Sequence, residues 1–343
     1  MRIALVAPPW IAIPPVGYGG TERVVHQLAE GLTARGHEVT LFASGDSRTT
    51  ARLRSLFPWH LAEHMGSTAY EARHIAFALS EIASGAEPFD VVHDHSGYQF
   101  VAFAPQILKC PMLHTLHGPF DVTNRGFYEQ FKHAMAFNAI SEDQRSQGPP
   151  DMNWVGVVHN AIDVEPRPFR AQSGDYLLAL GRICEQKGFH LAIEIARRTG
   201  RRLVMAGALQ TVNERYYREQ VEPFLDGEQI SYLGEVDEAR AQELFAGAAA
   251  FLFPIIWPEP FGIVMIEALA AGTPVIALRN GSVPEVIQHG VTGFVCDDVD
   301  EMVAAVRRIS EIDRATCRRV AEERFTTDRL VDGYEALYRR LAG

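Results

Sequence analysis

The first 36 residues, MRIALVAPPWIAIPPVGYGGTERVVHQLAEGLTARG, pass from a short apolar run into a longer amphipathic stretch. Ile3 to Ala7 is apolar throughout, which is typical of a strand buried on both faces of a parallel sheet. Thr21 to Arg35 places its apolar residues on one helical face; we expect Thr21 to be the N-cap and Gly36 to stop the helix. This segment therefore predicts a strand, a loop and a helix, the unit from which parallel α/β sheets are built.

The same alternation of apolar runs and amphipathic stretches continues along the chain. It predicts an α/β protein with two doubly wound parallel sheets, because each apolar run needs helices on both faces. The expected strands are residues 3–7, 38–43, 91–93, 112–116, 136–140 and 155–159 in the first half, and 176–180, 202–206, 230–233, 249–253 and 274–277 in the second.

A length of 343 residues suits two domains of ordinary size. The polar segment before Pro166 and Pro168 is typical of an interdomain hinge, so we place the boundary near residue 165. The expected domains are residues 1–165 and 166–325. A helix expected at about 327–341 carries an apolar stripe, and we expect the tail 326–343 to pack back on the first domain.

The composition excludes several classes of protein. A net charge of -11 argues against a nucleic-acid binder, and no run reaches the roughly 18 apolar residues of a membrane span. The N-terminal segment is typical of a strand and not of a signal peptide, so we expect a cytoplasmic protein. The four cysteines are scattered without zinc spacing, which predicts reduced thiols.

Two glycine-containing segments each follow an expected strand and precede an expected helix. Gly17-Tyr18-Gly19-Gly20-Thr21-Glu22 could present backbone N–H groups to an anion, although a simple strand-to-helix turn would show the same pattern. Gly181-Arg182-Ile183-Cys184-Glu185-Gln186-Lys187-Gly188 adds two cations beside a helix N-terminus, which suits a diphosphate. Ordinary solvated surface charge is the alternative for Arg182 and Lys187.

A third segment, Pro258-Glu259-Pro260-Phe261-Gly262-Ile263-Val264-Met265-Ile266-Glu267, carries two carboxylates eight positions apart. Glu259 lies in a loop bounded by prolines, and Glu267 lies in the first turns of an expected helix. The neighbours of Glu267 are apolar, so a ligand contact is favoured over an idle surface position.

These three segments, in this order and spacing, resemble the retaining GT-B glycosyltransferases of the glycogen-synthase-like family 4. The resemblance covers nearly the whole chain and implies a GT-B fold, two Rossmann-like domains with parallel sheets facing across a cleft. It implies a transferase of the hexosyltransferase type that moves a sugar from a UDP-, GDP- or ADP-type donor to an acceptor hydroxyl. It implies retention of configuration and neither a metal nor a cofactor, while the acceptor, a small molecule or a glycan, stays open.

The resemblance also implies roles for individual residues. Arg182 and Lys187 would hold the donor diphosphate, and Glu267 would bind the ribose hydroxyls. Glu259 and His117, in Leu113-His114-Thr115-Leu116-His117-Gly118, would lie at the transferred sugar. The predicted catalytic residues are His117, Glu259, Arg182 and Lys187. The predicted donor-binding residues are Gly19, Gly20, Arg182, Lys187, Phe261, Gly262, Ile263, Val264 and Glu267.

Further segments of this sequence resemble the family pattern or carry other interpretations. Asn160-Ala161-Ile162-Asp163 matches the hinge signature except for Ala161, and Asn280 to Glu285 suggests a structural role beside the donor. His93-Asp94-His95 could hold a metal, but we favour a role in the wall of the site. Asp298 and Asp300 fit a helix start better than a cation site, and Arg52 to Leu61 suggests an acceptor loop.

Two other functions remain open at this point. A nucleotide-sugar epimerase of the same fold would need no acceptor, and a noncatalytic sensor would keep the donor site without chemistry. The presence of all five polar site residues, His117, Arg182, Lys187, Glu259 and Glu267, favours an enzyme over a sensor.

Overall fold

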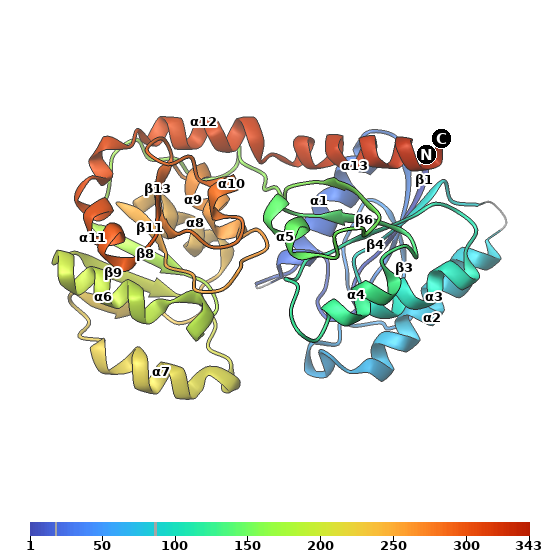
Figure 1. Ribbon diagram of the computed structural model, residues 1–343, viewed down its shortest axis with the longest axis horizontal. Helices are drawn as coiled ribbons and strands as arrows, with labels where there is room; N and C mark the ends of the chain where they lie inside the picture. The colour runs from blue at the N-terminus through green and yellow to red at the C-terminus, as the bar shows by residue number, and fades with distance from the viewer. Residues whose placement is uncertain (18, 86–87) are drawn as a thin grey trace. The chain divides into compact units, whose positions relative to one another are not determined.

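The computed structural model describes residues 1–17, 19–85 and 88–343, and it divides into two compact units. Unit 1 contains Met1–Ala161 and Thr327–Gly343, and unit 2 contains Ile162–Thr326 (Figure 1). We expected the boundary near residue 165, whereas the contacts within each unit place it between Ala161 and Ile162. Both ends of the chain belong to unit 1.

Unit 1 is built on a seven-stranded parallel sheet in the order β3-β2-β1-β4-β5-β6-β7. Its strands are β1 (Arg2–Val6), β2 (Glu38–Phe42), β3 (Arg52–Arg54), β4 (Val91–Asp94), β5 (Met112–Thr115), β6 (Ala136–Ala139) and β7 (Trp154–Val157). Its α-helices are α1 (Gly20–Ala34), α2 (Thr68–Ser84), α3 (Tyr98–Ile107), α4 (Arg125–Phe131), α5 (Glu142–Gln147) and α13 (Thr327–Ala342).

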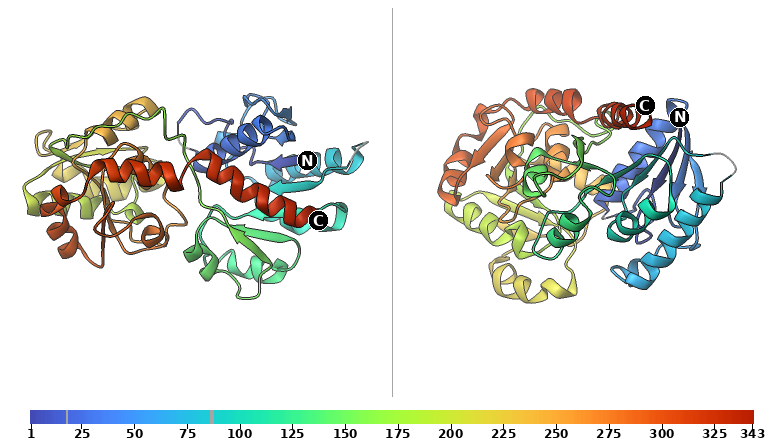
Figure 2. Two further views of the ribbon diagram at one scale, coloured as in Figure 1. Left: turned by 90° about the horizontal axis from the view of Figure 1, so that it is seen from above. Right: turned by 45° about the vertical axis from the view of Figure 1, so that its right-hand side comes forward.

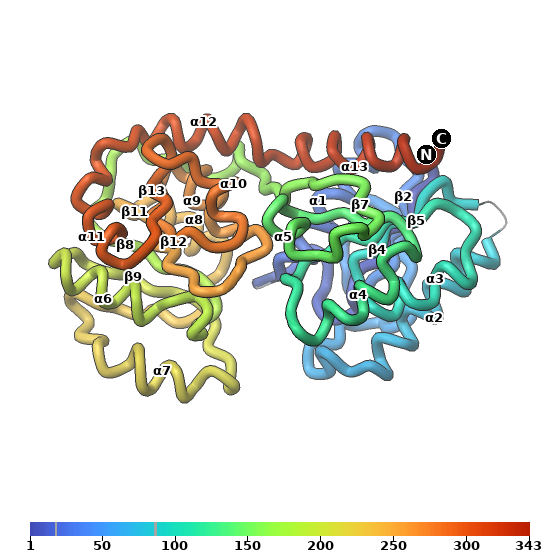
Figure 3. The backbone as a smooth tube through the Cα atoms, in the orientation of Figure 1, coloured from blue at the N-terminus to red at the C-terminus, as the bar shows by residue number. Residues whose placement is uncertain are grey.

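Unit 2 is built on a six-stranded parallel sheet in the order β10-β9-β8-β11-β12-β13, and Figure 3 traces its backbone. Its strands are β8 (Tyr176–Leu180), β9 (Arg202–Ala206), β10 (Ile230–Tyr232), β11 (Ala250–Phe253), β12 (Val275–Leu278) and β13 (Gly293–Cys296). Its α-helices are α6 (Phe189–Thr199), α7 (Glu214–Gln220), α8 (Glu238–Gly247), α9 (Ile263–Ala270), α10 (Val283–Val286), α11 (Val299–Arg307) and α12 (Arg314–Arg324). The expected α/β class with two Rossmann-like halves is confirmed.

The strand order fixes where a ligand can bind in each unit. In both sheets the order reverses beside the first strand, between β1 and β4 in unit 1 and between β8 and β11 in unit 2. Open α/β sheets bind ligands at the carboxyl ends of the strands at such a switch point. The expected ligand positions are therefore the loops after β1 and β4 in unit 1 and the loops after β8 and β11 in unit 2.

Two strands were not predicted from the sequence, β3 and β13. β3 (Arg52–Arg54) is a three-residue edge strand with two arginines, inside the stretch that we assigned to an acceptor loop. Short, charged strands are common at sheet edges, where they prevent pairing with other chains, and they lack an apolar run. β13 (Gly293–Cys296) is fully buried, but it begins with a glycine, which weakens any strand pattern.

The N-cap of α1 is also different from the expected one. The helix begins at Gly20 and is preceded by Gly19 with φ 157°, so Thr21 already lies inside the helix. A Cβ at Gly19 would lie 2.7 Å from Cβ of Pro15, and a residue with a side chain would not fit there. Gly19 therefore occupies the N-cap position, and the expectation that Thr21 caps the helix was wrong.

The C-terminal helix α13 is an integral part of unit 1, where it packs against α1 and β4 (Figure 2). Tyr334 and Tyr338 are completely buried on its inner face. Glu335 accepts hydrogen bonds from Arg35 Nη1 at 2.9 Å and contacts His37 Nε2 at 2.6 Å. The buried face of α13 therefore contributes to the core that covers the first sheet.

Candidate active site

In unit 2, the loop after β8 is held against the loop after β11 by a close backbone approach. Gly188 has φ 70°, and a Cβ on it would lie 2.0 Å from the carbonyl oxygen of Pro254. The amide of Ile256 donates to the carbonyl oxygen of Gln186 at 3.0 Å. These contacts bring Lys187 next to the residues that follow β11.

Lys187 and Glu259 are brought together as a salt bridge, with Nζ 2.5 Å from Oε2. The same carboxylate oxygen accepts a hydrogen bond from Nε1 of Trp257 at 2.9 Å. Nζ of Lys187 also lies 5.5 Å from the centre of the Trp257 ring and 5.7 Å from that of Phe253. Both partners are largely but not completely buried, so the ammonium has a low-dielectric environment and still has donors to offer.

Arg182 lies in the same loop, five positions before Lys187. Among the residues that the structure describes, its Nε is buried and has no hydrogen-bond partner. Buried polar atoms without a partner are uncommon in folded proteins and destabilise them, unless a ligand or water supplies the partner. A guanidinium in this condition favours an anionic ligand at the carboxyl end of β8.

The segment after β12 fastens the loop that carries Glu259. Gly281 has φ 55°, and a Cβ on it would lie 2.4 Å from the backbone nitrogen of Glu259. The amide of Ser282 donates to the carbonyl oxygen of Glu259 at 3.0 Å, and its hydroxyl donates to that of Phe261 at 2.7 Å. Asn280 Nδ2 donates to the carbonyl oxygen of Ile255 at 2.7 Å. This is the structural role that we expected for Asn280 to Glu285.

The N-terminus of α9 follows directly after Glu259. Gly262 is its N-cap in a left-handed conformation, and the first amide bonded within the helix is that of Met265, which donates to Gly262 at 2.9 Å. The amides of Ile263 and Val264 precede it at the positive end of the helix. Phe261 is buried, with its ring centre 6.0 Å from that of Phe325, so only its backbone is available to a ligand.

Glu267 lies one turn further along α9 and is paired with a residue that sequence reasoning did not single out. Its Oε1 lies 3.3 Å from Nη1 of Arg167, whose Nη2 donates to Glu238 at 3.3 Å. The Arg167 side chain is 7% exposed and that of Glu267 is 12% exposed. Arg167 therefore holds the Glu267 carboxylate in place. The sequence around Arg167, which lies between two prolines, did not indicate this pairing.

In unit 1, the glycine-rich segment leads into α1, as expected for a loop at the switch point. Gly19 and Gly20 stand at the helix start, and Arg23 Nη2 donates to the carbonyl oxygen of Gly17 at 3.2 Å. Glu22 is 5% exposed, and burial raises the pKa of its carboxyl group. Tyr18 of the quoted motif lies outside the described residues.

His117 follows β5 and is half-buried. Its Nε2 lies 2.8 Å from Nδ1 of His95, which follows β4, and the two rings are stacked with centres 5.1 Å apart. Burial, with a smaller effect of the neighbouring His114, lowers the pKa of His117 to about 3. The imidazole is therefore neutral at pH 7, and it can donate or accept one hydrogen bond through its second nitrogen.

Gln144, on α5, fixes the backbone on both sides of His117. Its Nε2 donates to the carbonyl oxygens of Leu116 at 3.2 Å and Gly118 at 2.7 Å, and its Oε1 accepts from the amide of Ile140 at 2.9 Å. The side chain is 1% exposed. Sequence reasoning missed Gln144, because a single polar residue in a short helix does not show that it is buried.

The histidines of β4 and β5 form two separate sets of contacts on opposite faces of the sheet. His93 and His95 share a face, as expected, with ring centres 3.9 Å apart. Asp94 Oδ2 lies 2.6 Å from His114 Nδ1 instead. Among residues 1–17, 19–85 and 88–343, no group of three or more His, Cys, Asp and Glu side chains is arranged to hold a metal ion.

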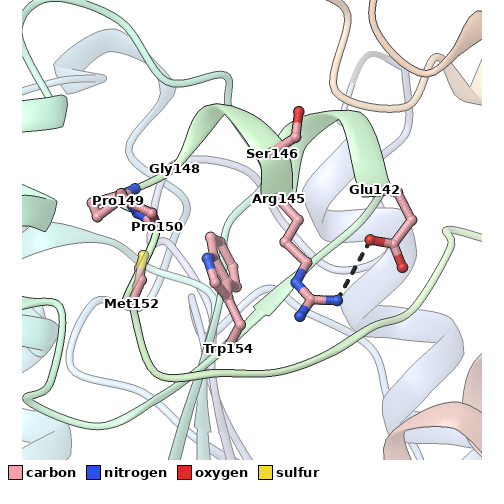
Figure 4. A pocket seen from close by; sticks show the side chains of 8 residues that line it. All are labelled: Glu142, Arg145, Ser146, Gly148, Pro149, Pro150, Met152 and Trp154. Atoms are coloured by element: carbon pink, nitrogen blue, oxygen red, sulfur yellow. Dashed lines mark ion pairs between the residues drawn. The ribbon is translucent and has the colours of Figure 1, made fainter.

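Unit 1 also contains a pocket of about 360 Å³ beside α5 and β7 (Figure 4). Arg145 and Glu142 form an ion pair of 3.5 Å at one side of it, and the Trp154 ring stands next to Arg145 in the view of Figure 4. The residues that line it are Glu142, Arg145, Ser146, Gly148, Pro149, Pro150, Met152 and Trp154. None of them belongs to the predicted site.

Comparison with known proteins agrees with this geometry. Residues 18–166 match the family described as "Glycosyltransferase Family 4", and residues 164–324 match "Glycosyl transferases group 1". The chain is a family 4-like glycosyltransferase. The resemblance inferred from the three motifs is therefore confirmed, and this glycosyltransferase is an enzyme of the transferase class.

Individual relatives cover nearly the full length of the glycosyltransferase. A glycogen synthase of Mycobacterium tuberculosis is 29% identical over 389 residues, which span 96% of this chain and 91% of that protein. The crystal structure of AviGT4, a glycosyltransferase involved in avilamycin A biosynthesis, is 26% identical with a TM-score of 0.71 and coverage of 100% and 98%. Anabaena Alr3699/HepE, in complex with UDP and glucose, shares the fold at 17% identity and a TM-score of 0.75, with coverage of 99% and 100%.

These comparisons leave the roles of individual residues as predictions, and the epimerase alternative gains no support from them. No helix among the described residues combines the length and the apolar character that a membrane crossing requires.

Proposed function

We propose that this glycosyltransferase takes its sugar from a nucleoside diphosphate and that unit 2 binds the diphosphate. The observation that carries the proposal is the buried Nε of Arg182, which has no partner among the described residues, in the same loop as Lys187. A diphosphate would supply acceptors to both cations, and the amides of Ile263 and Val264 would add donors at the positive end of α9. UDP in the structure of the HepE neighbour supports the same class of donor.

The remaining roles are proposals that follow from the family resemblance. Glu267, held by Arg167, would accept hydrogen bonds from the ribose hydroxyls. Glu259 and His117 would contact the transferred sugar, while Gly19 and Gly20 would offer backbone N–H groups. UDP, GDP and ADP are all consistent with these contacts, since none of them reads the base.

In the proposed reaction, the bond between the anomeric carbon and the diphosphate oxygen breaks, and a bond to the acceptor oxygen forms on the same face. Because the new bond forms on the face that the diphosphate leaves, the configuration is retained. The acceptor proton passes to the departing phosphate oxygen, and the proposed step uses neither a protein nucleophile nor a metal. Arg182 and Lys187 would stabilise the negative charge that grows on the diphosphate, and preorganised charges of this kind commonly contribute several kcal/mol to catalysis.

Binding of the nucleotide is the first test. UDP, GDP or ADP at 100 times its dissociation constant should stabilise the protein by about 2.7 kcal/mol, which raises the melting temperature by roughly 5 to 10 °C. Arg182→Ala and Lys187→Ala should abolish this shift. Arg215→Ala is the matched control, because Arg215 is an exposed cation of the same unit, 87% exposed in a helical ion pair. Equal loss in the control, or no shift with any of the three, would refute the donor site.

Turnover is the second test. Without an acceptor, the matching nucleotide sugar should be hydrolysed slowly to the nucleoside diphosphate, and the rate should be unchanged by EDTA. With an acceptor, proton NMR of the product should show the anomeric configuration of the donor. An isomeric nucleotide sugar as the only product would indicate an epimerase, and an inverted product would contradict the same-face mechanism.

A further inference from the structure

In unit 1, His117 contacts a second histidine, His95, which is buried. His95 is 4% exposed, and its Nδ1 lies 2.8 Å from Nε2 of His117. The ring of His95 also contacts that of His93, whose centre is 3.9 Å away. His93 is itself fixed by contacts of Nδ1 with the hydroxyl of Tyr338 at 2.6 Å and of Nε2 with that of Thr115 at 2.7 Å. The position of His95 is therefore set by the core of the unit.

We propose that His95 is a positioning residue, which fixes the ring of His117 through its Nε2 and leaves only Nδ1 of that ring for the ligand. The proposal rests on the proposed function, in which His117 contacts the transferred sugar. An imidazole has two polar nitrogens, and without His95 the ring of His117 could turn and present either of them. The contact with His95 therefore presents Nδ1 of His117, and not Nε2, to the ligand.

The protons in this pair are correlated. A neutral imidazole carries one N–H, so a proton on Nδ1 of His95 would require the proton of His117 to lie on its Nδ1, which then donates to the ligand. A proton on Nε2 of His117 would leave its Nδ1 as an acceptor. A sugar hydroxyl can meet either state, because it both donates and accepts. Among the described residues, Nε2 of His95 is buried without a partner, so the contact with His117 is the hydrogen bond that its side chain makes.

Burial keeps both rings neutral. It lowers the pKa of His117 to about 3 and that of His95 well below its ordinary value. The titratable groups around the pair are His93 and Asp94 from β4, His114 from β5, and Tyr334 and Tyr338 from α13. Asp94 Oδ2 contacts Nδ1 of His114 at 2.6 Å, on the opposite face of the sheet from His95.

Three substitutions at position 95 separate positioning from simple packing. The side-chain polar atoms of asparagine lie where Nδ1 of histidine lies, so His95→Asn should keep the contact with His117. Glutamine places its polar atoms near Nε2, so His95→Gln should lose the contact although its side chain is larger than that of asparagine. His95→Ala removes the contact and admits water. His133→Ala, at a histidine whose side chain is 64% exposed, is the control.

The first readout is the titration of His117, followed by NMR in protein with carbon-13-labelled histidine and identified by comparison with His117→Asn. In the wild type, in His95→Asn and in the control, we expect no titration of His117 between pH 5 and 8. In His95→Gln and His95→Ala, hydration should raise its pKa toward the ordinary value of about 6.5. A His117 resonance that does not change in His95→Gln, or an asparagine variant that behaves like the glutamine variant, would overturn the proposal.

The second readout is the pH profile of donor hydrolysis. Loss of one neutral hydrogen bond predicts a decrease of about tenfold in kcat/KM for His95→Gln, with a new acid limb near pH 6, whereas His95→Asn should stay close to the wild type. If the NMR result is as expected but no protein hydrolyses any donor, the proposed function fails and the positioning contact stands. If hydrolysis is normal but the profiles of the asparagine and glutamine variants coincide, the positioning role is refuted.

Discussion

The contact between Gly188 and Pro254 predicts that a single methyl group will disturb the proposed donor site. Gly188 and Gly200 flank α6, as its N-cap and C-cap, with φ values of 70° and 67°. A Cβ on Gly188 would lie 2.0 Å from the Pro254 carbonyl oxygen, whereas a Cβ on Gly200 would have nothing within 4 Å. Gly200→Ala is therefore a control with the same backbone conformation and without the close approach.

The expected magnitudes follow from these two geometries. The left-handed conformation costs an alanine about 1 to 2 kcal/mol, which applies to both variants. Carbon and oxygen atoms in contact are normally separated by about 3.3 Å or more, so Gly188→Ala must push the two loops apart by more than an ångström. Overpacking of this kind adds about 1 to 3 kcal/mol. We expect a loss of about 1 to 2 kcal/mol for Gly200→Ala and about 2 to 5 kcal/mol for Gly188→Ala.

Urea denaturation followed by tryptophan fluorescence measures these losses, and calorimetric titration with the matching nucleoside diphosphate measures the consequence for binding. Gly188→Ala should weaken binding, because displacement of the loop moves Lys187 away from Glu259 and breaks the bond from Ile256 to Gln186. Gly200→Ala should bind normally. Equal destabilisation of the two variants, or normal nucleotide binding by a folded Gly188→Ala protein, would refute the reasoning.

Two further predictions concern the buried polar groups of unit 1. Tyr338→Phe leaves Nδ1 of His93 without its partner and should lower the free energy of unfolding by about 1 to 3 kcal/mol; Tyr217→Phe, which removes a hydroxyl that makes no hydrogen bond among the described residues, should change it far less in the same denaturation experiment. Burial lowers the pKa of His74 to about 4, because it disfavours the protonated imidazole. The stability that depends on a neutral His74 is therefore fully present above the ordinary pKa of about 6.5 and is lost as the pH falls toward 4. His74→Gln keeps a donor for the carbonyl oxygen of Ala7, and its unfolding free energy should fall less between pH 7 and 5 than that of the wild type; parallel curves would contradict the assignment.

Most of the fold could be predicted because most of its strands are short apolar runs and its longer helices have an apolar stripe. Arg202–Ala206 was predicted with its observed bounds, and α13 begins at the expected Thr327. Asp298 caps α11 by accepting a hydrogen bond from the amide of Glu301 at 2.9 Å, as the pattern indicated. These features depend on residues close in the sequence, and local patterns describe them well.

The candidate site was predictable only in part, for a physical reason. Motifs place Arg182 and Lys187 in one loop, but a sequence does not show that Lys187 is paired with Glu259, 72 residues later. Likewise, Gln144 and Arg167 are ordinary polar residues until the fold buries them. Contacts of this kind arise from how loops meet at the end of a sheet, and that meeting depends on strand order.

The polar groups of β4 have a consequence for the register of the sheet. Asp94 is directly opposite His114 in the pairing of β4 with β5 and bonds to it on one face, while His93 and His95 bond to other partners on the opposite face. A slip of one residue would exchange the two faces, because the period of a strand is two. After such a slip, several buried polar atoms of β4 and β5 would lose their partners, at about 1 to 3 kcal/mol each. The groups that surround His117 therefore also select the one register in which His117 and His95 can meet.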